Sequence, residues 1–291
     1  MKRPTLVVGV LGGVIVGALL GACQSAPPPA APTAAASPAA SSPAPAAVSA
    51  EAPAPAAASS GAAPAVSPAI QAAVAASDRT DDDKKLDAGR HPAEMLAFFG
   101  IAPGMHVAEV AAGAGYTTEL LARTVGPTGT VYGENSKGFL GFVGKPWGER
   151  LAKPALKNVV RVDRELDDPL PPEAKDLDAV LNVLTYHDTV WIGVDRARMN
   201  AAIFAALKHG GVYGIVDHSA KAGTGLNDVK TVHRIDESAL REEIEHAGFK
   251  FQAEAAFLRN PSDTRDWNDS PRAAGDKRGT SDRFVLRFVK P

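Results

Sequence analysis

The chain has 291 residues, with 31 Lys and Arg against 33 Asp and Glu, so its formal net charge is −2. This near-neutral balance, without a cluster of basic residues interleaved with aromatic ones, argues against nucleic acid as a partner. The single cysteine, Cys23, excludes an internal disulfide.

The first 23 residues have the pattern of an export signal. The basic pair Lys2-Arg3 precedes an apolar run over 6–20, which is shorter than the roughly 20 residues that cross a membrane. Small residues follow and end at Cys23, which is typical of a secretory signal and similar to a bacterial lipobox. We therefore expect 1–23 to be a lipoprotein signal peptide with Cys23 lipidated. A plain signal peptide cut elsewhere, or an uncleaved anchor, is the alternative.

The next segment, 24–77, is almost only Ala, Pro and Ser. Such a composition buries too little apolar surface to offset the entropy of ordering, and Pro-rich chains stay extended. We expect 24–77 to be a disordered tether, in which 70–76 could form a short helix, and 78–291 to be one globular domain. With the lipobox, this predicts a cell-envelope lipoprotein that faces the periplasm. In a Gram-negative cell, Gln24 is typical of an outer-membrane lipoprotein.

Beyond residue 78, apolar strands alternate with helical patterns, which predicts βαβ units and a mostly parallel sheet. The predicted elements, in chain order, are a helix over 93–99, a strand over 106–110, a helix over 117–125, strands over 130–132, 159–162 and 177–184, a helix over 195–207, a strand over 212–216, a helix from 236 to 247, and strands over 249–257 and 284–289. No helical pattern separates the last two strands. The predicted fold class is therefore α/β, a doubly wound, mostly parallel, Rossmann-like seven-stranded sheet with a C-terminal antiparallel hairpin.

The stretch 109–116, Glu-Val-Ala-Ala-Gly-Ala-Gly-Tyr, is the most informative motif. A strand breaks into a turn of small residues and restarts as a helix, so backbone amides and a helix N-terminus can approach a ligand closely. A dinucleotide-binding fingerprint would have a third glycine where Thr118 stands. The unit instead resembles motif I of class I S-adenosylmethionine-dependent methyltransferases.

The segment from about residue 87 to 291 is similar to a family of bacterial class I methyltransferases. The matching stretches are 90–94, 109–116, 186–188, 195–200, 210–213, 217–219, 233–236, 259–261 and 282–285. The resemblance implies the methyltransferase fold, methyl transfer as the reaction and S-adenosylmethionine as the cofactor. It implies no particular acceptor.

Ligands of open α/β sheets bind beyond the carboxyl ends of the strands. The predicted cofactor-binding residues lie there, in the turn after the first strand and at the end of the second: Glu109, Ala111, Gly113, Gly115, Tyr116 and Glu134. A carboxylate at Glu134 can accept hydrogen bonds from both ribose hydroxyls. Ala111 replaces a glycine of the motif, which suits the turn only where the backbone φ is negative. Either Asp163 or Asp167 could accept a hydrogen bond from the adenine amine.

Polar residues also follow the fourth and fifth strands, and the predicted catalytic residues are Tyr186, His187, Asp188 and His218. Methyl transfer mainly requires alignment and the exclusion of water, but a hydroxyl nucleophile gains from a base, for which histidine is best suited near neutral pH. His187 and His218 are the candidate bases, and Tyr186 and Asp188 could orient the substrate or fix a histidine tautomer. Structural histidines bonded to the backbone are the alternative.

The same residues, with Asp217 and His233, are of the types that bind metals through nitrogen and oxygen. No close pair of the His-x-x-x-His kind is present, so we predict no metal. Residues 82–91 and the loop 259–283 could close over the cofactor or be solvated surface.

Three functions compete. The first is a methyltransferase acting on a small molecule or an envelope component. The second is a non-catalytic, lipid-tethered ligand-binding domain on a methyltransferase scaffold, because a fold does not fix a function. The third and weakest is a hydrolase or metal-assisted enzyme that uses His187, Asp188, Asp217 and His218. The absence of a Gly-x-Ser-x-Gly motif disfavours its serine-hydrolase form.

Overall fold

The computed structural model describes residues 65–291. The predicted signal peptide, Cys23 and most of the predicted tether lie outside the described residues. In the described part, no helix combines the length and apolar character needed to span a membrane. Helix α1 (Pro68–Ala75) buries Ile70 and packs on helix α4 (Tyr116–Val125), so the folded domain begins before residue 78, where its boundary was expected.

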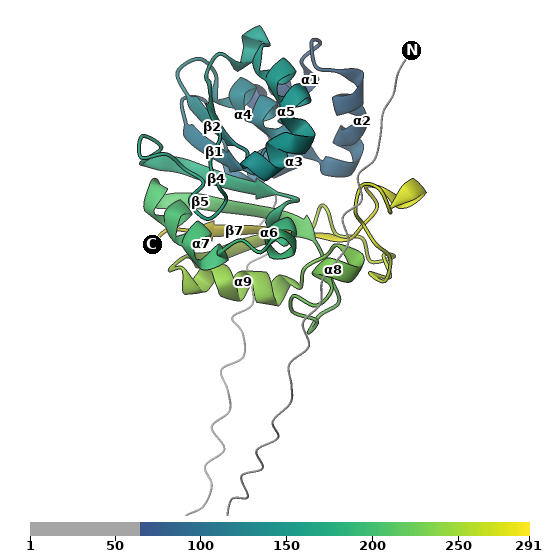
Figure 1. The fold of residues 1–291 in the computed structure, drawn as a ribbon. Coiled ribbons are helices and arrows are strands. Elements are labelled where there is room, and N and C mark those ends of the chain that lie inside the picture. The colour runs from purple at the N-terminus through teal and green to yellow at the C-terminus, as the bar shows by residue number, and fades with distance from the viewer. Residues whose placement is uncertain (1–64) are drawn as a thin grey trace, which may run out of the picture. The chain divides into compact units, whose positions relative to one another are not determined.

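Seven strands form one sheet in the order β3-β2-β1-β4-β5-β7-β6 (Figure 1). Their bounds are β1 (His106–Val110), β2 (Thr130–Glu134), β3 (Val159–Val162), β4 (Leu177–Val183), β5 (Leu207–His218), β6 (Lys250–Ala255) and β7 (Arg283–Val289). Strands β1 to β5 are parallel, and β7 runs antiparallel between β5 and β6. The predicted fold class is confirmed, including the antiparallel C-terminal pair.

Helices cover both faces of the sheet (Figure 1). One face carries α1, α3 (Pro92–Phe99), α4 and α5 (Lys137–Leu151), and the other carries α7 (Arg196–Ala206) and α9 (Glu237–His246). Three further helices are α2 (Asp81–Arg90), α6 (Tyr186–Ile192), which follows β4, and α8 (Val229–Val232), and two short 3₁₀ turns cover Pro154–Leu156 and Gly275–Lys277.

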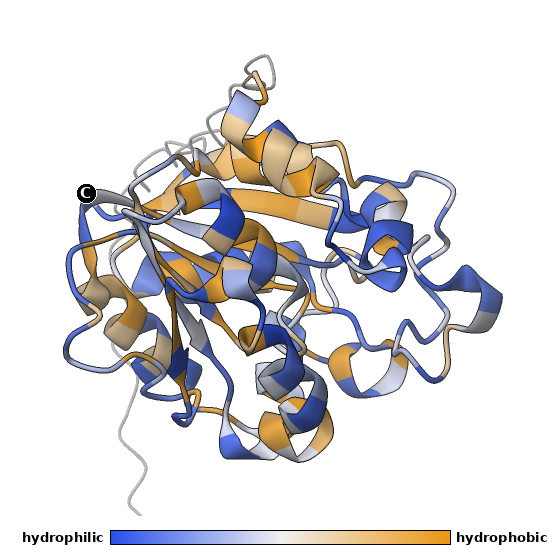
Figure 2. Cartoon of the chain, turned by 90° about the horizontal axis from the view of Figure 1, so that it is seen from above, coloured by the Kyte–Doolittle hydropathy of each residue, from blue (hydrophilic) through white to orange (hydrophobic). Residues whose placement is uncertain are grey.

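Each face has its own hydrophobic core. Leu120 and Phe99 belong to the cluster under α3 and α4, and Ile203 and Leu240 belong to the cluster under α7 and α9. Figure 2 shows largely hydrophobic strands with hydrophilic residues mostly in the surrounding helices and loops. Burial on both faces explains why β4 reads as an almost continuous apolar run.

Two helices that the sequence pattern did not predict, α2 and α5, support the helix that follows the glycine turn. Helix α2 is held by Asp87, which accepts hydrogen bonds from both terminal nitrogens of Arg79 (2.8 and 2.7 Å) and from the Tyr116 hydroxyl (2.6 Å). Helix α5 is anchored by Trp147, which is fully buried. Both helices thereby pack against the start of α4.

Candidate active site

The turn after β1 is fixed to the end of β2 by two buried side chains. The Ala111 amide donates a hydrogen bond to Glu134 Oε2 (2.9 Å). The Gly113 amide donates to Asn135 Oδ1 (2.8 Å), and Asn135 Nδ2 donates back to the Gly113 carbonyl (3.0 Å). The predicted neighbours Ala111, Gly113 and Glu134 therefore do come together.

Ala111 has a φ of +56°, in the left-handed region. Alanine was expected to suit this turn only with a negative φ, and Ala111 does not have one. An L-residue in this conformation costs roughly 1–2 kcal/mol. Leu184 and His233, farther along the carboxyl ends, also have positive φ. Strained residues of this kind cluster at functional sites.

Glu134 fits the role of a ribose-binding carboxylate. Its side chain is fully buried, and its Oε1 atom has no hydrogen-bond partner among the described residues. Burial raises the pKa of Glu134 to about 8. An acceptor oxygen without a donor, beside the glycine turn, suits the hydroxyl groups of the implied cofactor, S-adenosylmethionine. Because this oxygen is buried, the turn must shift for a ligand to reach it.

The other predicted cofactor residues have internal partners. Gly115 has a φ of +80°, and a Cβ placed there would lie 2.4 Å from the Trp147 ring, so this glycine is required by the packing of α5. Tyr116 bonds to α2 through Asp87. Glu109 is buried and accepts a hydrogen bond from Thr118, and burial raises its pKa to about 7.

The candidates for the adenine amine are engaged elsewhere. Asp163 accepts hydrogen bonds from Arg161, and Asp167 accepts one from Arg198. Neither contact favours one of the two as the adenine ligand.

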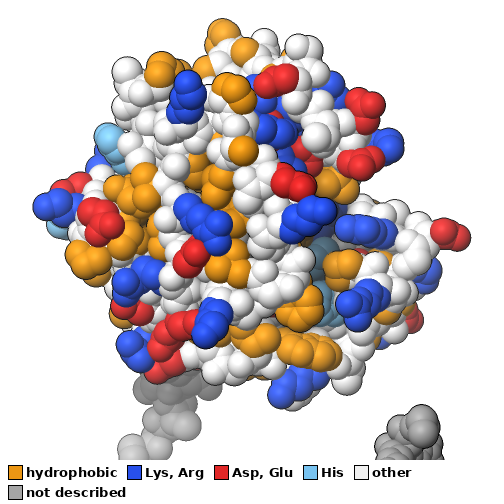
Figure 3. Space-filling model, turned by 45° about the horizontal axis from the view of Figure 1, so that its top comes forward, with side chains coloured by type: hydrophobic (Ala, Val, Ile, Leu, Met, Phe, Trp, Pro, Cys, Tyr) orange, Lys and Arg blue, Asp and Glu red, His pale blue; other side chains and the backbone are white. Residues whose placement is uncertain are grey.

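A cavity of about 720 Å³ opens at the ends of β4 and β5, and Figure 3 shows it as a hollow with histidine in its depth and Lys and Arg around its rim. Its walls come from α2, from the residues after β4 and β5, from the end of α8 and from the loop before β7. Of the predicted catalytic residues, Asp188 and His218 line it. Residues 82–91 and the loop 259–283, which were expected to close over a ligand, form two walls of this cavity.

Three arginines from the segments that were expected to close over a ligand line this cleft: Arg90, Arg278 and Arg283. None of the three makes an ion pair with another described residue. Burial lowers the pKa of both Arg90 and Arg283. Guanidinium groups without carboxylate partners suit an anionic ligand.

His187 is fully buried and paired with Asp217. Its Nδ1 atom lies 2.6 Å from Asp217 Oδ1, and its backbone amide donates to Asp217 Oδ2 (2.8 Å). Burial alone would lower the pKa of His187, but the charge of Asp217 and the hydrogen bond to it raise that pKa to about 9. A histidine protonated at neutral pH is unsuited to the role of general base expected for it.

His218 is better placed for that role. Its Nδ1 atom lies 2.9 Å from Ser281 Oγ and 2.5 Å from Asp269 Oδ2. Burial lowers the pKa of His218 below its usual value, so the ring is neutral at pH 7. Asp269 was missed because it lies in an irregular loop that carries no periodic signal.

Tyr186 lies away from the cleft. Its hydroxyl donates to Glu243 Oε2 (2.9 Å) and accepts from Asn200 Nδ2 (2.9 Å), within the core beneath α7 and α9. Because α6 begins at Tyr186, successive side chains point about 100° apart, and Tyr186 and Asp188 face different surroundings. The predicted catalytic role of Tyr186 therefore has no support in this geometry.

Known proteins resemble the chain in two ways. The family model of protein-L-isoaspartate(D-aspartate) O-methyltransferase (PCMT) matches residues 76–141, which hold the glycine turn and Glu134 but make up less than half of the chain. No curated protein sequence matches the chain at a significant level.

Several solved structures share the fold. An S-adenosylmethionine-dependent methyltransferase from Aquifex aeolicus is 20% identical, covers 73% of this chain and 100% of its own, and has a TM-score of 0.50. A putative sarcosine dimethylglycine methyltransferase from Galdieria sulphuraria is 15% identical, with coverages of 72% and 91% and a TM-score of 0.52. A structure of the complex between the Haloferax volcanii Trm112 methyltransferase activator and the putative methyltransferase also matches. The matched chain is 16% identical, covers 76% of this chain and 97% of its own, and has a TM-score of 0.51.

At these identities the structural similarity establishes the fold. Together with the family match over residues 76–141, it supports the predicted enzyme class, a methyltransferase, and the predicted cofactor, S-adenosylmethionine.

Proposed function

We propose that residues 65–291 form a methyltransferase that uses S-adenosylmethionine and acts on a small molecule with an anionic group. The observation that carries this proposal is the buried carboxyl of Glu134, bonded to the glycine turn through one oxygen and without a partner on the other. The fold and the family match over residues 76–141 support the same cofactor. The near-neutral charge of the chain favours a small molecule over nucleic acid.

The polar residues at the carboxyl ends of the strands divide into two groups with different tasks. S-adenosylmethionine, when bound, supplies an electrophilic methyl group, and Glu134 with the glycine turn would hold it. On the acceptor side, the arginines of the cleft bind the anionic group. His218, oriented by Ser281 and Asp269, accepts the proton of an acceptor hydroxyl. Helix α2 and the loop before β7 limit the access of water.

Calorimetric titration of the protein with S-adenosylmethionine and with its demethylated product tests the cofactor. We expect micromolar binding that Glu134→Ala weakens about tenfold, which is the upper end of the loss expected for one hydrogen bond. Glu242→Ala, which removes an exposed carboxylate on α9, is the matched control and should bind like the wild type. Absence of binding to either compound would contradict the proposal.

One observation favours the alternative of a non-catalytic binding domain. The amides of Ala111 and Gly113 are already bonded to Glu134 and Asn135. A protein whose thermal stability does not change at saturating S-adenosylmethionine would support this alternative, because any ligand that binds the native state raises its stability. Binding without methyl transfer to any anionic hydroxyl compound would support it as well.

We further propose that Cys23 carries a lipid that anchors the protein in the cell envelope, based on the basic, apolar and small-residue pattern before it. Fractionation of cells that express the wild type and Cys23→Ser tests this. The wild type should appear in the membrane fraction and incorporate labelled fatty acid, and the variant should do neither. Equal distribution of the two proteins would contradict lipidation.

A further inference from the structure

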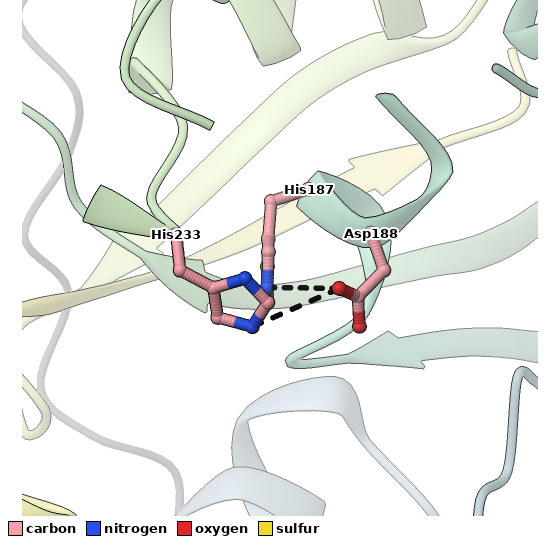
Figure 4. Close-up of side chains that lie close together, drawn as sticks. All are labelled: His187, Asp188 and His233. Carbon is pink, nitrogen blue, oxygen red and sulfur yellow. Dashed lines mark ion pairs between the residues drawn. The ribbon is translucent and has the colours of Figure 1, made fainter. Parts of the chain in front are cut away.

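We propose that His187, Asp188 and His233 bind one divalent transition-metal ion at the cleft. Figure 4 shows the three side chains converging, with the two histidine rings side by side and the Asp188 carboxylate facing both. Asp188 Oδ1 lies 3.5 Å from His187 Nε2 and 3.7 Å from His233 Nε2. The three ligand atoms all lie within 4.8 Å of one another.

These separations are close to those of a metal shell. Zinc binds imidazole nitrogen and carboxylate oxygen at about 2.0–2.2 Å, which in a tetrahedron places neighbouring ligand atoms about 3.4 Å apart. The distances of 3.5 and 3.7 Å from Asp188 Oδ1 to the two histidine nitrogens are only slightly longer than this separation. The ring centroids of His187 and His233 are 4.2 Å apart and nearly perpendicular, so both rings can present a nitrogen without a clash.

His187 supplies an independent observation. Its Nε2 atom is buried and has no hydrogen-bond partner in the described part of the chain, whereas buried polar atoms are nearly always paired. Its other ring nitrogen, Nδ1, is hydrogen-bonded to the buried carboxylate of Asp217. A carboxylate behind a histidine is the usual second partner of metal-bound imidazole, because it fixes the ring orientation and the tautomer. Asp217 therefore aims the unpaired nitrogen at the site, where the ion takes the place of the proton that Nε2 carries in the metal-free protein.

His233 and Asp188 connect the site to the cleft, because both line the cavity of about 720 Å³. Three protein ligands leave at least one coordination position open toward that cavity. His233 ends α8 with a φ of +59°, so its ring is presented by a strained backbone. Two imidazoles and one carboxylate favour zinc, iron or another transition ion over calcium and magnesium, which prefer oxygen ligands.

The sequence predicted no metal because it contains no close pair of histidines. The fold supplies the pair instead, since the start of α6 and the end of α8 pack against each other. An ion here would add positive charge to a cleft that already holds three arginines, and its open position would face an anionic ligand.

Titration of the untagged, chelator-treated protein with Co²⁺ and Zn²⁺, without S-adenosylmethionine, tests the site separately from the proposed function. We expect one ion per chain, with Co²⁺ giving the visible absorption of a nitrogen and oxygen shell. Asp188→Asn and His233→Ala should each weaken the affinity at least tenfold. The control, His246→Ala, removes an exposed histidine of α9 and should leave the affinity unchanged.

His187 is left intact in these variants because its removal would leave Asp217 buried without its partner. Failure to bind either ion at one per chain would overturn the proposal. Stoichiometric binding that survives both Asp188→Asn and His233→Ala would overturn it too, because the ion would then lie elsewhere.

Discussion

Ala111 is held in a backbone conformation that favours glycine, with a φ of +56°. We expect Ala111→Gly to raise the free energy of unfolding by about 0.5–1 kcal/mol, because relief of the strain exceeds the entropy that glycine adds to the unfolded chain. Ala112→Gly, at a neighbour without a positive φ, is the matched control and should lower stability. Urea denaturation of both variants measures the difference. A loss of stability in Ala111→Gly would show that the turn is not strained.

Asp217 is the buried acceptor for three donors: the His187 ring, the His187 amide and the His218 amide. Asp217→Asn removes the charge that faces the His187 imidazolium, and we expect a loss of about 3 kcal/mol at pH 7, as for other broken buried pairs. The control, Asp163→Asn, breaks a half-exposed pair with Arg161 and should cost less than about 1 kcal/mol. Similar losses in the two variants, measured by denaturation, would contradict a charged buried pair.

At the scale of elements, the contact between α5 and the glycine turn yields a paired test. A methyl group at Gly115 would meet the Trp147 ring at 2.4 Å, whereas one at Gly113 would meet nothing within 4 Å, and both residues have positive φ. Gly113→Ala should therefore cost only the conformational strain of about 1–2 kcal/mol. Gly115→Ala should cost at least about 2 kcal/mol more, as expected for overpacking.

Urea unfolding, monitored by the fluorescence of the three tryptophans, measures both losses through the shift of its midpoint. Equal losses in the two variants would mean that Trp147 moves aside at little cost, and that α5 does not depend on the close approach of Gly115.

The elements that could be predicted are those with a periodic apolar pattern. The strand over His106–Val110 and the helix through Val125 were found in this way, because the sheet is buried on both faces. Helix α2 was missed because its residues are mostly charged and show no apolar stripe, since ion pairs dock it instead. Helix α5 was missed because Pro146 and several glycines interrupt the pattern, while a single residue, Trp147, anchors it.

The site was predictable only where it follows strand ends. Glu134 meets the turn at Ala111 because parallel strands β1 and β2 end together. Tyr186 was assigned wrongly to the cleft, since the start of α6 rotates it into the core. Asp269 and Arg278 carry no local signal, because the loop that brings them to the cleft is shaped by tertiary contacts.

For the whole molecule in its metal-free form, three buried groups make stability depend on pH in one direction. The pKa values of Glu109 and Glu134 are raised to about 7 and 8, and that of His187 to about 9. Above pH 6.5 each group keeps its proton in the native state up to about its own raised pKa, whereas the unfolded chain has largely released it. The stability that they contribute is complete below their unfolded pKa values and is lost as pH rises through the folded ones.

The lowered pKa values of His218 and His233 oppose this trend only weakly, since both rings are neutral in the native state and the unfolded rings lose their remaining protons just above pH 6.5. The free energy of unfolding should therefore fall from pH 6.5 to 8.5, with each proton contributing up to about 1.4 kcal/mol per pH unit. Calorimetry at both pH values measures the fall as a lower Tm. Glu134→Gln, which cannot release a proton, should make the dependence shallower, and an equally steep dependence in this variant would mean that Glu134 is ionised in the native protein at neutral pH.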